Sequence, residues 1–278
     1  MFIISKKLKD GKRIARITSG PNKNKFIYLK EEITDADIKE SIKSMNRKDI
    51  EELEKQISEG KYVSTVFKNE IKTQGKLQPM PQKGKIERIY ISGPSGSGKS
   101  HYAGKYVKEY LKMYPGNEFY VISTIGDDNA LDEHDPDRIE VDDEFLIEPP
   151  TPEYLRDSIT VFDDVDKIAR ADLRKSVQTL RSWELEQGRH FNTSMLCTSH
   201  LLFDYSQTKR LLNEATTVVL FPRAGSQFHI KKYLEKYMGL DREQRTKILK
   251  LPSRWVALYT GYPQYVIHEK GVFMLNQE

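Results

Sequence analysis

Residues 89–100, IYISGPSGSGKS, decide the fold of this chain. The stretch begins with apolar residues typical of a buried strand, and residues 93–100 match G-x-x-x-x-G-K-[ST] at every fixed position. This pattern is typical of a glycine-rich turn between a strand and a helix. The backbone N–H groups of such a turn, together with the helix N-terminus, bind phosphate groups. The stretch therefore predicts a phosphate-binding loop in an α/β protein.

The loop predicts how a nucleoside triphosphate would be held. Lys99 is expected to reach the β- and γ-phosphates, and Ser100 is expected to ligate Mg²⁺. The expected ligands are therefore ATP and Mg²⁺. The residues expected to bind the nucleotide are Gly93, Pro94, Ser95, Gly96, Ser97, Gly98, Lys99 and Ser100.

Paired acids follow a second apolar strand, in the segment ITVFDDVD at residues 159–166. Asp163 comes 64 positions after Lys99, which leaves room for a strand and helix between them. We expect Asp163 to bind Mg²⁺ through a water molecule and Asp164 to polarise the attacking water. The alternative is that these acids, with Asp166, form a solvated turn or cap a helix.

A third apolar strand, SMLCTSH at residues 194–200, ends in polar residues. A polar side chain at the carboxyl end of this strand can contact the γ-phosphate or its water, and His200 is the candidate, with Thr198 and Ser199 behind it. The alternative is an ordinary loop histidine.

Phosphoryl transfer also needs a cation near the developing charge, which a neighbouring subunit often supplies. Arg189 and Arg210 are the favoured candidates, and the alternative is that they form surface ion pairs. The arginines considered are Arg181, Arg189, Arg210 and Arg223.

The order of apolar strands and amphipathic helices predicts a mostly parallel sheet covered on both faces. The tail, with short strands near 255–259, 265–268 and 272–275, predicts a C-terminal β-hairpin. The five strands expected before it are 89–92, 119–124, 159–162, 194–198 and 217–221. The expected helices run from the loop to 112 and over 170–186, 206–213 and 230–238.

The first 85 residues predict a small α+β region, with a helix from about Thr34 to Gly60. Residues 73–85, TQGKLQPMPQKGK, have two prolines and two glycines and predict a linker. The expected domains are therefore 1–85 and a P-loop ATPase domain at 86–278.

Composition excludes several classes of protein. The chain has 278 residues and a single cysteine, Cys197, which excludes a disulfide framework. It has 37% hydrophobic and 10% aromatic residues, unlike a disordered chain. No stretch reaches the roughly 18–20 apolar residues of a membrane helix. We expect an intracellular protein that is not secreted.

The net charge of +4 is the sum of three blocks of sequence whose charges differ in sign. Residues 1–88 have 21 Lys and Arg against 13 Asp and Glu, residues 89–167 have 7 against 18, and residues 168–278 have 17 against 10. Basic blocks make nucleic acid a candidate partner, although lysine-rich surfaces also serve solubility. The acidic stretch 127–144 would repel DNA, so we expect it to lie away from any DNA channel or against a basic partner; the alternative is a solvated loop.

Taken together, residues 86–278 resemble the poxvirus-type genome-packaging ATPases of large DNA viruses, within the FtsK–HerA superfamily. The segments that resemble this family are IYISGPSGSGKS, VFDDVD, GRHFNTSMLCTSH and RLLNEATTVVLFPRAG. His200 stands where the superfamily often has glutamine, and Asp164 stands where many relatives have glutamate.

The resemblance implies a RecA-like core in a homo-oligomeric ring that uses ATP hydrolysis to drive double-stranded DNA into a capsid. The implied partners are DNA and capsid or other virion proteins, and the implied location is the host cytoplasm, a virus factory or the virion. Two alternatives stay open. One is an assembly or secretion ATPase that does not translocate DNA, and the other is a guanylate-kinase-like nucleotide kinase.

Overall fold

The structure is a computed structural model that describes residues 1–8, 11–31, 69–124, 126–203 and 208–275. Its larger sheet is built on strands that are buried on both faces, as expected for parallel strands covered by helices. Every residue of β9 (Ser158–Phe162) and of β10 (Ser194–Ser199) is buried. Along β6 (Arg88–Ser92), Ile89 and Ile91 belong to one hydrophobic core and Tyr90 belongs to the other.

Six parallel strands form the centre of this sheet in the order β11-β6-β10-β9-β7-β8. The strands not yet given bounds are β7 (Glu118–Ser123), β8 (Asp137–Glu140) and β11 (Thr217–Leu220). Strand β10 lies between β6 and β9, with Ser199 opposite Ser92 and Cys197 opposite Phe162. The chain segments that follow β6, β9 and β10 therefore meet at one edge of the sheet.

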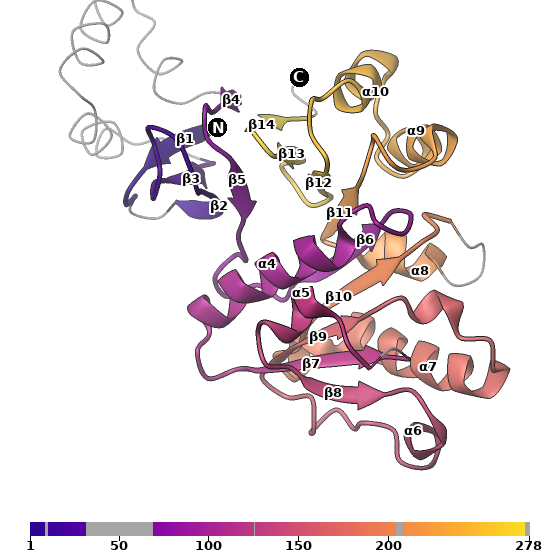
Figure 1. Ribbon diagram of the computed structural model, residues 1–278. Helices are drawn as coiled ribbons and strands as arrows, with labels where there is room; N and C mark the ends of the chain where they lie inside the picture. The colour runs from indigo at the N-terminus through magenta and orange to yellow at the C-terminus, as the bar shows by residue number, and fades with distance from the viewer. Residues whose placement is uncertain (9–10, 32–68, 125, 204–207, 276–278) are drawn as a thin grey trace, which may run out of the picture.

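Helices cover both faces of the sheet (Figure 1). On one face lie α4 (Lys99–Met113) and α5 (Asn129–Asp132), and on the other lie α7 (Ala171–Gln187) and α8 (Thr208–Glu214). Tyr102, Tyr106 and Tyr110, four residues apart, are buried on one side of α4. The predicted α/β fold with a RecA-like P-loop core is confirmed.

The C-terminal strands continue the sheet beyond β11 as an antiparallel meander, which confirms the predicted hairpin. They are β12 (Val256–Tyr259), β13 (Tyr265–His268) and β14 (Gly271–Met274). Helix α9 (Gln227–Lys236) was expected, whereas α10 (Arg242–Leu249) was not. Its signal is a capping box, in which Asp241 and Gln244 each accept a backbone hydrogen bond from the other.

The N-terminal sheet has the order β1-β3-β2-β5. Its strands are β1 (Phe2–Ser5), β2 (Lys12–Ile17), β3 (Phe26–Leu29) and β5 (Leu77–Pro79). The linker predicted at 73–85 is therefore wrong in part, because β5 lies inside it and is buried. Proline is tolerated there because β5, among the described strands, lies at the edge of its sheet and pairs with β2 alone. Just before it, β4 (Glu70–Lys72) pairs with β14 in the larger sheet.

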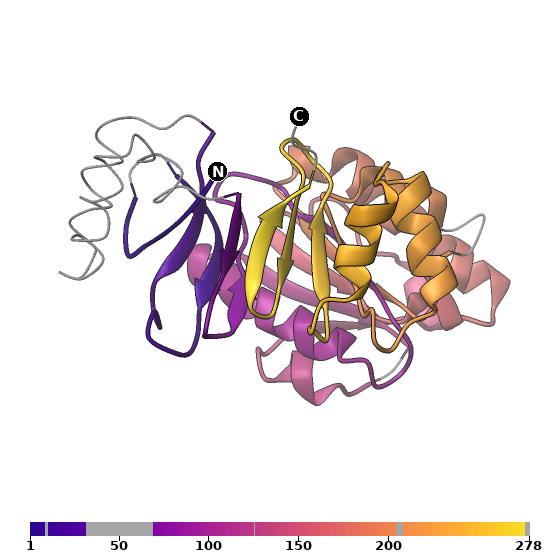
Figure 2. The same ribbon diagram turned by 90° about the horizontal axis from the view of Figure 1, so that it is seen from above.

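The N-terminal sheet packs directly on the larger unit (Figure 2). The rings of Phe2 and Tyr265 meet edge to face with centroids 5.9 Å apart, and Leu77 N–H donates to the carbonyl of Glu269 at 2.8 Å. Arg16 forms an ion pair with the buried Glu109 of α4. One hydrophobic core therefore spans both parts, and the domain boundary at residue 85 stays a prediction.

The acidic stretch 127–144 forms regular elements, which excludes the alternative of a solvated loop; its place relative to DNA stays a prediction. It contains α5, β8 and the start of α6 (Asp143–Ile147). Asp128 and Asp142 cap the two helices by accepting backbone N–H groups, and the apolar Leu131 and Phe145 are buried beneath. The helix predicted from Thr34 to Gly60 lies outside the described residues.

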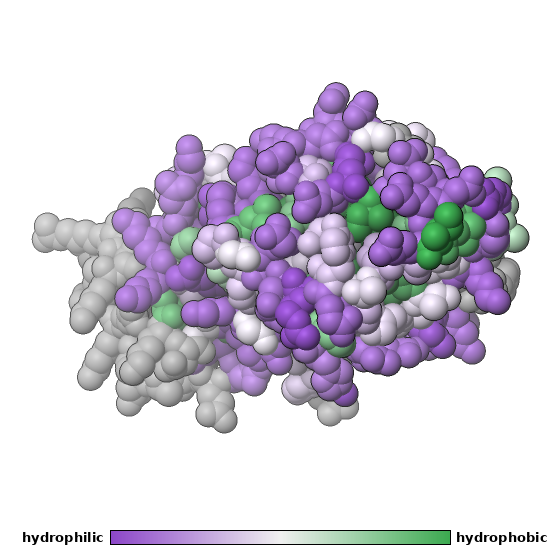
Figure 3. Space-filling view, turned by 90° about the horizontal axis from the view of Figure 1, so that it is seen from below, coloured by the Kyte–Doolittle hydropathy of each residue, from purple (hydrophilic) through white to green (hydrophobic). Residues whose placement is uncertain are grey.

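The surface seen from below is mostly hydrophilic, with small separate hydrophobic patches (Figure 3). Within the described ranges, no helix is both long enough and apolar enough to cross a membrane.

Candidate active site

The glycine-rich loop, residues 93–98, connects β6 to α4 and is wound closely against the sheet. A Cβ on Gly93 would lie 2.7 Å from Ser97 Oγ and 2.8 Å from the Phe221 ring, so only glycine fits. Gly98 has φ of 106°, in the region that favours glycine, and helix α4 begins at the next residue. The loop is therefore shaped as a phosphate-binding loop requires.

A buried hydroxyl in this loop has no protein partner. Ser97 is 7% exposed, and its Oγ makes no hydrogen bond to any described residue. A buried polar atom without a partner is costly, and a ligand oxygen would satisfy it. Together with the N-terminus of α4, this orphaned group fits an anionic ligand.

Three predicted residues meet beside the loop, although they come from three different elements. Lys99 Nζ, at the start of α4, lies 3.5 Å from Asp164 Oδ1 and 3.5 Å from His200 Nε2. His200 Nε2 lies 2.6 Å from Asp164 Oδ2. The adjacent ends of β9 and β10 explain this meeting.

Thr198 connects the two acids at the centre of the site. Its hydroxyl donates to Asp163 Oδ1 at 2.7 Å and accepts the backbone N–H of Asp164 at 2.9 Å. Thr198 is completely buried, so both bonds are shielded from water. Asp164 has φ of 49°, a left-handed conformation that aspartate tolerates better than most residues.

Asp166 fixes the residues at the end of β10, including His200. Its Oδ2 accepts the Ser199 hydroxyl at 2.8 Å and the backbone N–H of His200 at 3.0 Å. The sequence treated this acid only as part of a turn, and the signal was the third acid in VFDDVD. Thr198 therefore fixes the acids, and Asp166 fixes His200.

The environment moves the pKa values of the two neighbouring acids in opposite directions. Burial raises the pKa of Asp163, although the Thr198 hydrogen bond partly opposes it. Burial also acts to raise the pKa of Asp164, but the hydrogen bond with His200 and the charge of Lys99 outweigh it and lower that pKa. Asp164 is therefore held as a carboxylate.

Ser100 and Asp163 fit a magnesium ion that is shared with a nucleotide. Over the described part of the chain, no three His, Cys, Asp or Glu side chains gather in a way that could hold a metal alone. Mg²⁺ typically uses one or two carboxylates, waters and substrate phosphates, so a serine and a carboxylate beside a phosphate loop suit it.

The structure does not bring Arg189 and Arg210 to this cluster. Arg189 lies in the short turn after α7, before β10 begins, and Arg210, in the first turn of α8, pairs with Glu186 of α7 at 2.8 Å. A role toward a neighbouring subunit stays a prediction. Arg181 is buried, with its guanidinium 3.9 Å from the Cys197 sulfur, and Arg223 follows β11.

An arginine that the sequence did not single out lies beside the loop. Arg254 Nη2 is 3.5 Å from the position that a Cβ on Gly98 would take. In the sequence, Arg254 is only one of the basic residues in the block 168–278. The structure brings it to the loop because the segment before β12 passes the N-terminus of α4.

A parallel sheet with this strand order, a glycine-rich loop and a helix at its carboxyl edge defines a P-loop NTPase core of the RecA-like class. No model of a known protein family matches the chain. Over 265 residues it is 34% identical to "Uncharacterized protein V3" of Sputnik virophage, and the match covers 95% of each chain. The chain belongs to the same family as that protein.

Solved structures similar to the chain include a viral genome packaging NTPase and a conjugation coupling protein. The genome packaging NTPase B204 of Sulfolobus turreted icosahedral virus 2, in complex with AMPPCP, matches at TM-score 0.46 and 13% identity, over 66% of this chain and 97% of that one. The pCW3 conjugation coupling protein TcpA matches at TM-score 0.48 and 14% identity, over 95% and 78%. A genome-packaging NTPase is thus among the proteins to which the chain is similar, as the sequence motifs predicted.

Proposed function

We propose that this protein is an ATP-hydrolysing motor that translocates double-stranded DNA into a viral capsid. The observation that carries the ATPase part is the contact of Lys99, Asp164 and His200 beside a phosphate loop with an orphaned buried hydroxyl. Such an arrangement supplies a phosphate ligand, a carboxylate for the attacking water and a polar contact with the γ-phosphate.

Hydrolysis depends on how these side chains change partners. Lys99 Nζ lies 3.5 Å from Asp164 Oδ1. A bound triphosphate would draw Lys99 to its oxygens, which frees Asp164 to orient a water molecule. Bound Mg²⁺ would add charge stabilisation at the phosphates, held by Ser100 and Asp163. His200, fixed by Asp166, would then contact the γ-phosphate or the water.

The DNA part of the proposal rests on the sequence resemblance of residues 86–278 and on charge. The last 111 residues, 168–278, carry 17 Lys and Arg against 10 Asp and Glu. Contacts from such a surface to DNA phosphates would be independent of sequence and strongly dependent on salt. A ring would also allow Arg189 or Arg210 to reach the site of a neighbouring subunit.

The test is the rate of ATP hydrolysis against the concentration of double-stranded DNA, at two salt concentrations, with the oligomeric mass measured in parallel. We expect DNA to stimulate hydrolysis and the higher salt to weaken the stimulation. A Lys99→Ala variant should stay folded and lose hydrolysis, because Lys99 serves the phosphates. Unchanged turnover in that variant would refute the ATPase assignment.

The same assay separates the alternatives. Hydrolysis without any dependence on DNA would favour an assembly or secretion ATPase. Transfer of phosphate to GMP, measured in a coupled assay, would favour a nucleotide kinase.

A further inference from the structure

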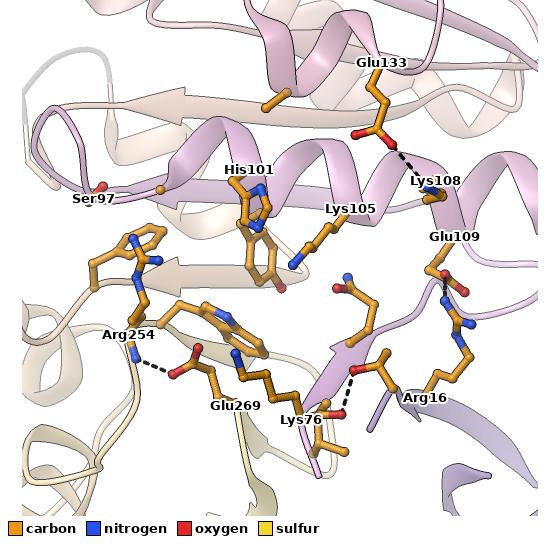
Figure 4. Close-up of a pocket in the computed structure, with 18 of the residues that line it drawn as sticks. Arg16, Lys76, Ser97, His101, Lys105, Lys108, Glu109, Glu133, Arg254 and Glu269 are labelled. Atoms are coloured by element: carbon orange, nitrogen blue, oxygen red, sulfur yellow. Dashed lines mark hydrogen bonds and ion pairs between the residues drawn. The ribbon is translucent and has the colours of Figure 1, made fainter. Parts of the chain in front are cut away.

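A cavity of about 420 Å³ opens beside the phosphate loop. Ser97 and Gly98 line one end of it, and the exposed side chains of α4 line its length (Figure 4). None of Lys99, Asp163, Asp164 and His200 lines it. The loop therefore has the catalytic cluster on one side and this cavity on the other.

The position of the cavity matters because a nucleoside triphosphate is a linear molecule. If its γ-phosphate lies at Lys99 and Asp164, its other end must leave the loop on the side of Ser97 and Gly98. We infer that this cavity binds the base and ribose of the nucleotide, and that the N-terminal sheet forms its far wall. The inference rests on the proposed ATPase function.

Aromatic side chains support this assignment. Tyr102 is 4% exposed and lines the cavity. Trp255 lines the cavity beside it, with its ring edge to face on Tyr102 at 5.1 Å. An aromatic surface and a few polar groups are what a small-molecule site needs.

The charges of the cavity are unbalanced toward positive. Glu109 pairs with Arg16, and Glu133 pairs with Lys108. The remaining acid, Glu269, accepts the backbone N–H of Arg254. Three lining cations make no ion pair with any described side chain, namely Lys76, Lys105 and Arg254.

These cations suit the two kinds of acceptor on a nucleotide. Arg254, next to Gly98, is placed for phosphate oxygens at the end of the loop. Lys76 and Lys105 lie further along the cavity (Figure 4) and carry only donors, which match the ring nitrogens of adenine and the ribose hydroxyls. The burial of His101 and its cationic neighbours Lys105 and Arg254 lower the histidine's pKa, consistent with this positive field.

The far wall comes from residues that the sequence resemblance does not cover. Arg16, Thr18 and Gln78 line the cavity from the N-terminal sheet, and Lys76 lies just before β5. The ion pair of Arg16 with the buried Glu109 fastens this wall to α4. The N-terminal sheet thereby becomes part of the nucleotide site.

The experiment compares two ligands, ATP and inorganic tripolyphosphate, by calorimetry on the full chain. Tripolyphosphate has the phosphates without the nucleoside. Lys105→Trp places bulk in the cavity from an exposed position on α4, and Lys175→Trp is the matched control at an exposed position of α7, on the other face of the sheet. We expect Lys105→Trp to weaken ATP binding at least tenfold and to leave tripolyphosphate binding within twofold.

A second pair of variants tests whether the N-terminal sheet forms the far wall of the cavity. Lys76→Trp fills the cavity from the N-terminal side and should also weaken ATP selectively, whereas Lys23→Trp, in the turn between β2 and β3, should not. Equal ATP affinity in Lys105→Trp and its control would overturn the nucleoside assignment. If Lys99→Ala leaves the binding of both ligands unchanged, the phosphate-loop function itself fails, which is a separate outcome.

Discussion

Thr198→Val is the most direct test of how the site is held together. Valine has nearly the shape of threonine, so no cavity is created, but the hydroxyl is lost. Asp163 then loses a hydrogen bond of 2.7 Å, and the backbone N–H of Asp164 loses an acceptor at 2.9 Å. Because Thr198 is fully buried, water cannot easily replace either bond.

The expected effect has a stability part and a functional part. A hydrogen bond to a charged group contributes about 1.5–3 kcal/mol, and a buried donor left unpaired costs about 1–3 kcal/mol. Since the two losses overlap, we expect the free energy of unfolding to fall by roughly 2–4 kcal/mol. Partners that orient metal ligands typically change metal affinity or activity by about 10–100-fold, so half-maximal hydrolysis should need that much more Mg²⁺.

The assay is a Mg²⁺ titration of ATP hydrolysis, with urea unfolding in parallel. Thr193→Val is the control, because Thr193 is also buried and its hydroxyl donates to the carbonyl of Leu155 at 3.0 Å, before β10 begins. It should lose stability without any change in the Mg²⁺ requirement. If Thr198→Val keeps the wild-type Mg²⁺ curve, the idea that Thr198 positions Asp163 is wrong.

Substitutions at three further residues address the remaining parts of the site and the core. Asp164→Asn should keep ATP binding, measured by calorimetry, and slow hydrolysis at least tenfold, because the amide cannot accept a proton; a wild-type rate would remove Asp164 from the mechanism. Asp166→Ala should lower kcat about tenfold with little change in KM, since Ser199 and His200 lose their acceptor. Asp166→Asn, which keeps an acceptor oxygen, should restore most of the rate, and a failure of rescue would argue against positioning. Burial raises the pKa of Glu184 to about 8, so its contribution to stability is full below pH 4.5 and is lost as pH rises toward 8. The unfolding free energy of wild type relative to Glu184→Gln should therefore fall by about 1.4 kcal/mol per pH unit over that window, and parallel curves would contradict a neutral buried Glu184.

The parts of the fold that were predictable follow local rules. The apolar strands 159–162 and 194–198 are visible in the sequence because both faces of a central parallel strand are buried. The helices α5 and α6 were missed because their few apolar residues stand among acids, and the aspartates that cap them look like loop residues. Strand β5 was missed because its proline is acceptable only at a sheet edge, a fact that depends on tertiary pairing.

Some residues of the candidate site could also be predicted from local sequence, and others could not. The loop and the acids at 163 and 164 have fixed spacing and follow strands, so their meeting could be expected from parallel strand ends. The roles of Thr198 and Asp166 depend on the register of β10 against β9, which no local pattern reveals. The position of Arg254 could not be predicted from local sequence, because more than 150 residues separate it from the loop beside which it lies.

The placement of the cations bears on how hydrolysis would be controlled. Arg254 lies beside Gly98 and lines the cavity, and Arg223 follows β11 on the far side of β6 from β10. Near Asp164 the described ion-pair partners are only lysines and a histidine, namely Lys99, Lys167 and His200. The proposed mechanism needs a further cation at that end; Arg189 follows α7 near the start of β10 and Arg210 pairs with Glu186, so in the proposed ring either could serve the site of a neighbouring copy. Hydrolysis by such a site should therefore depend on assembly, with a rate per subunit that rises with protein concentration until the oligomer is complete.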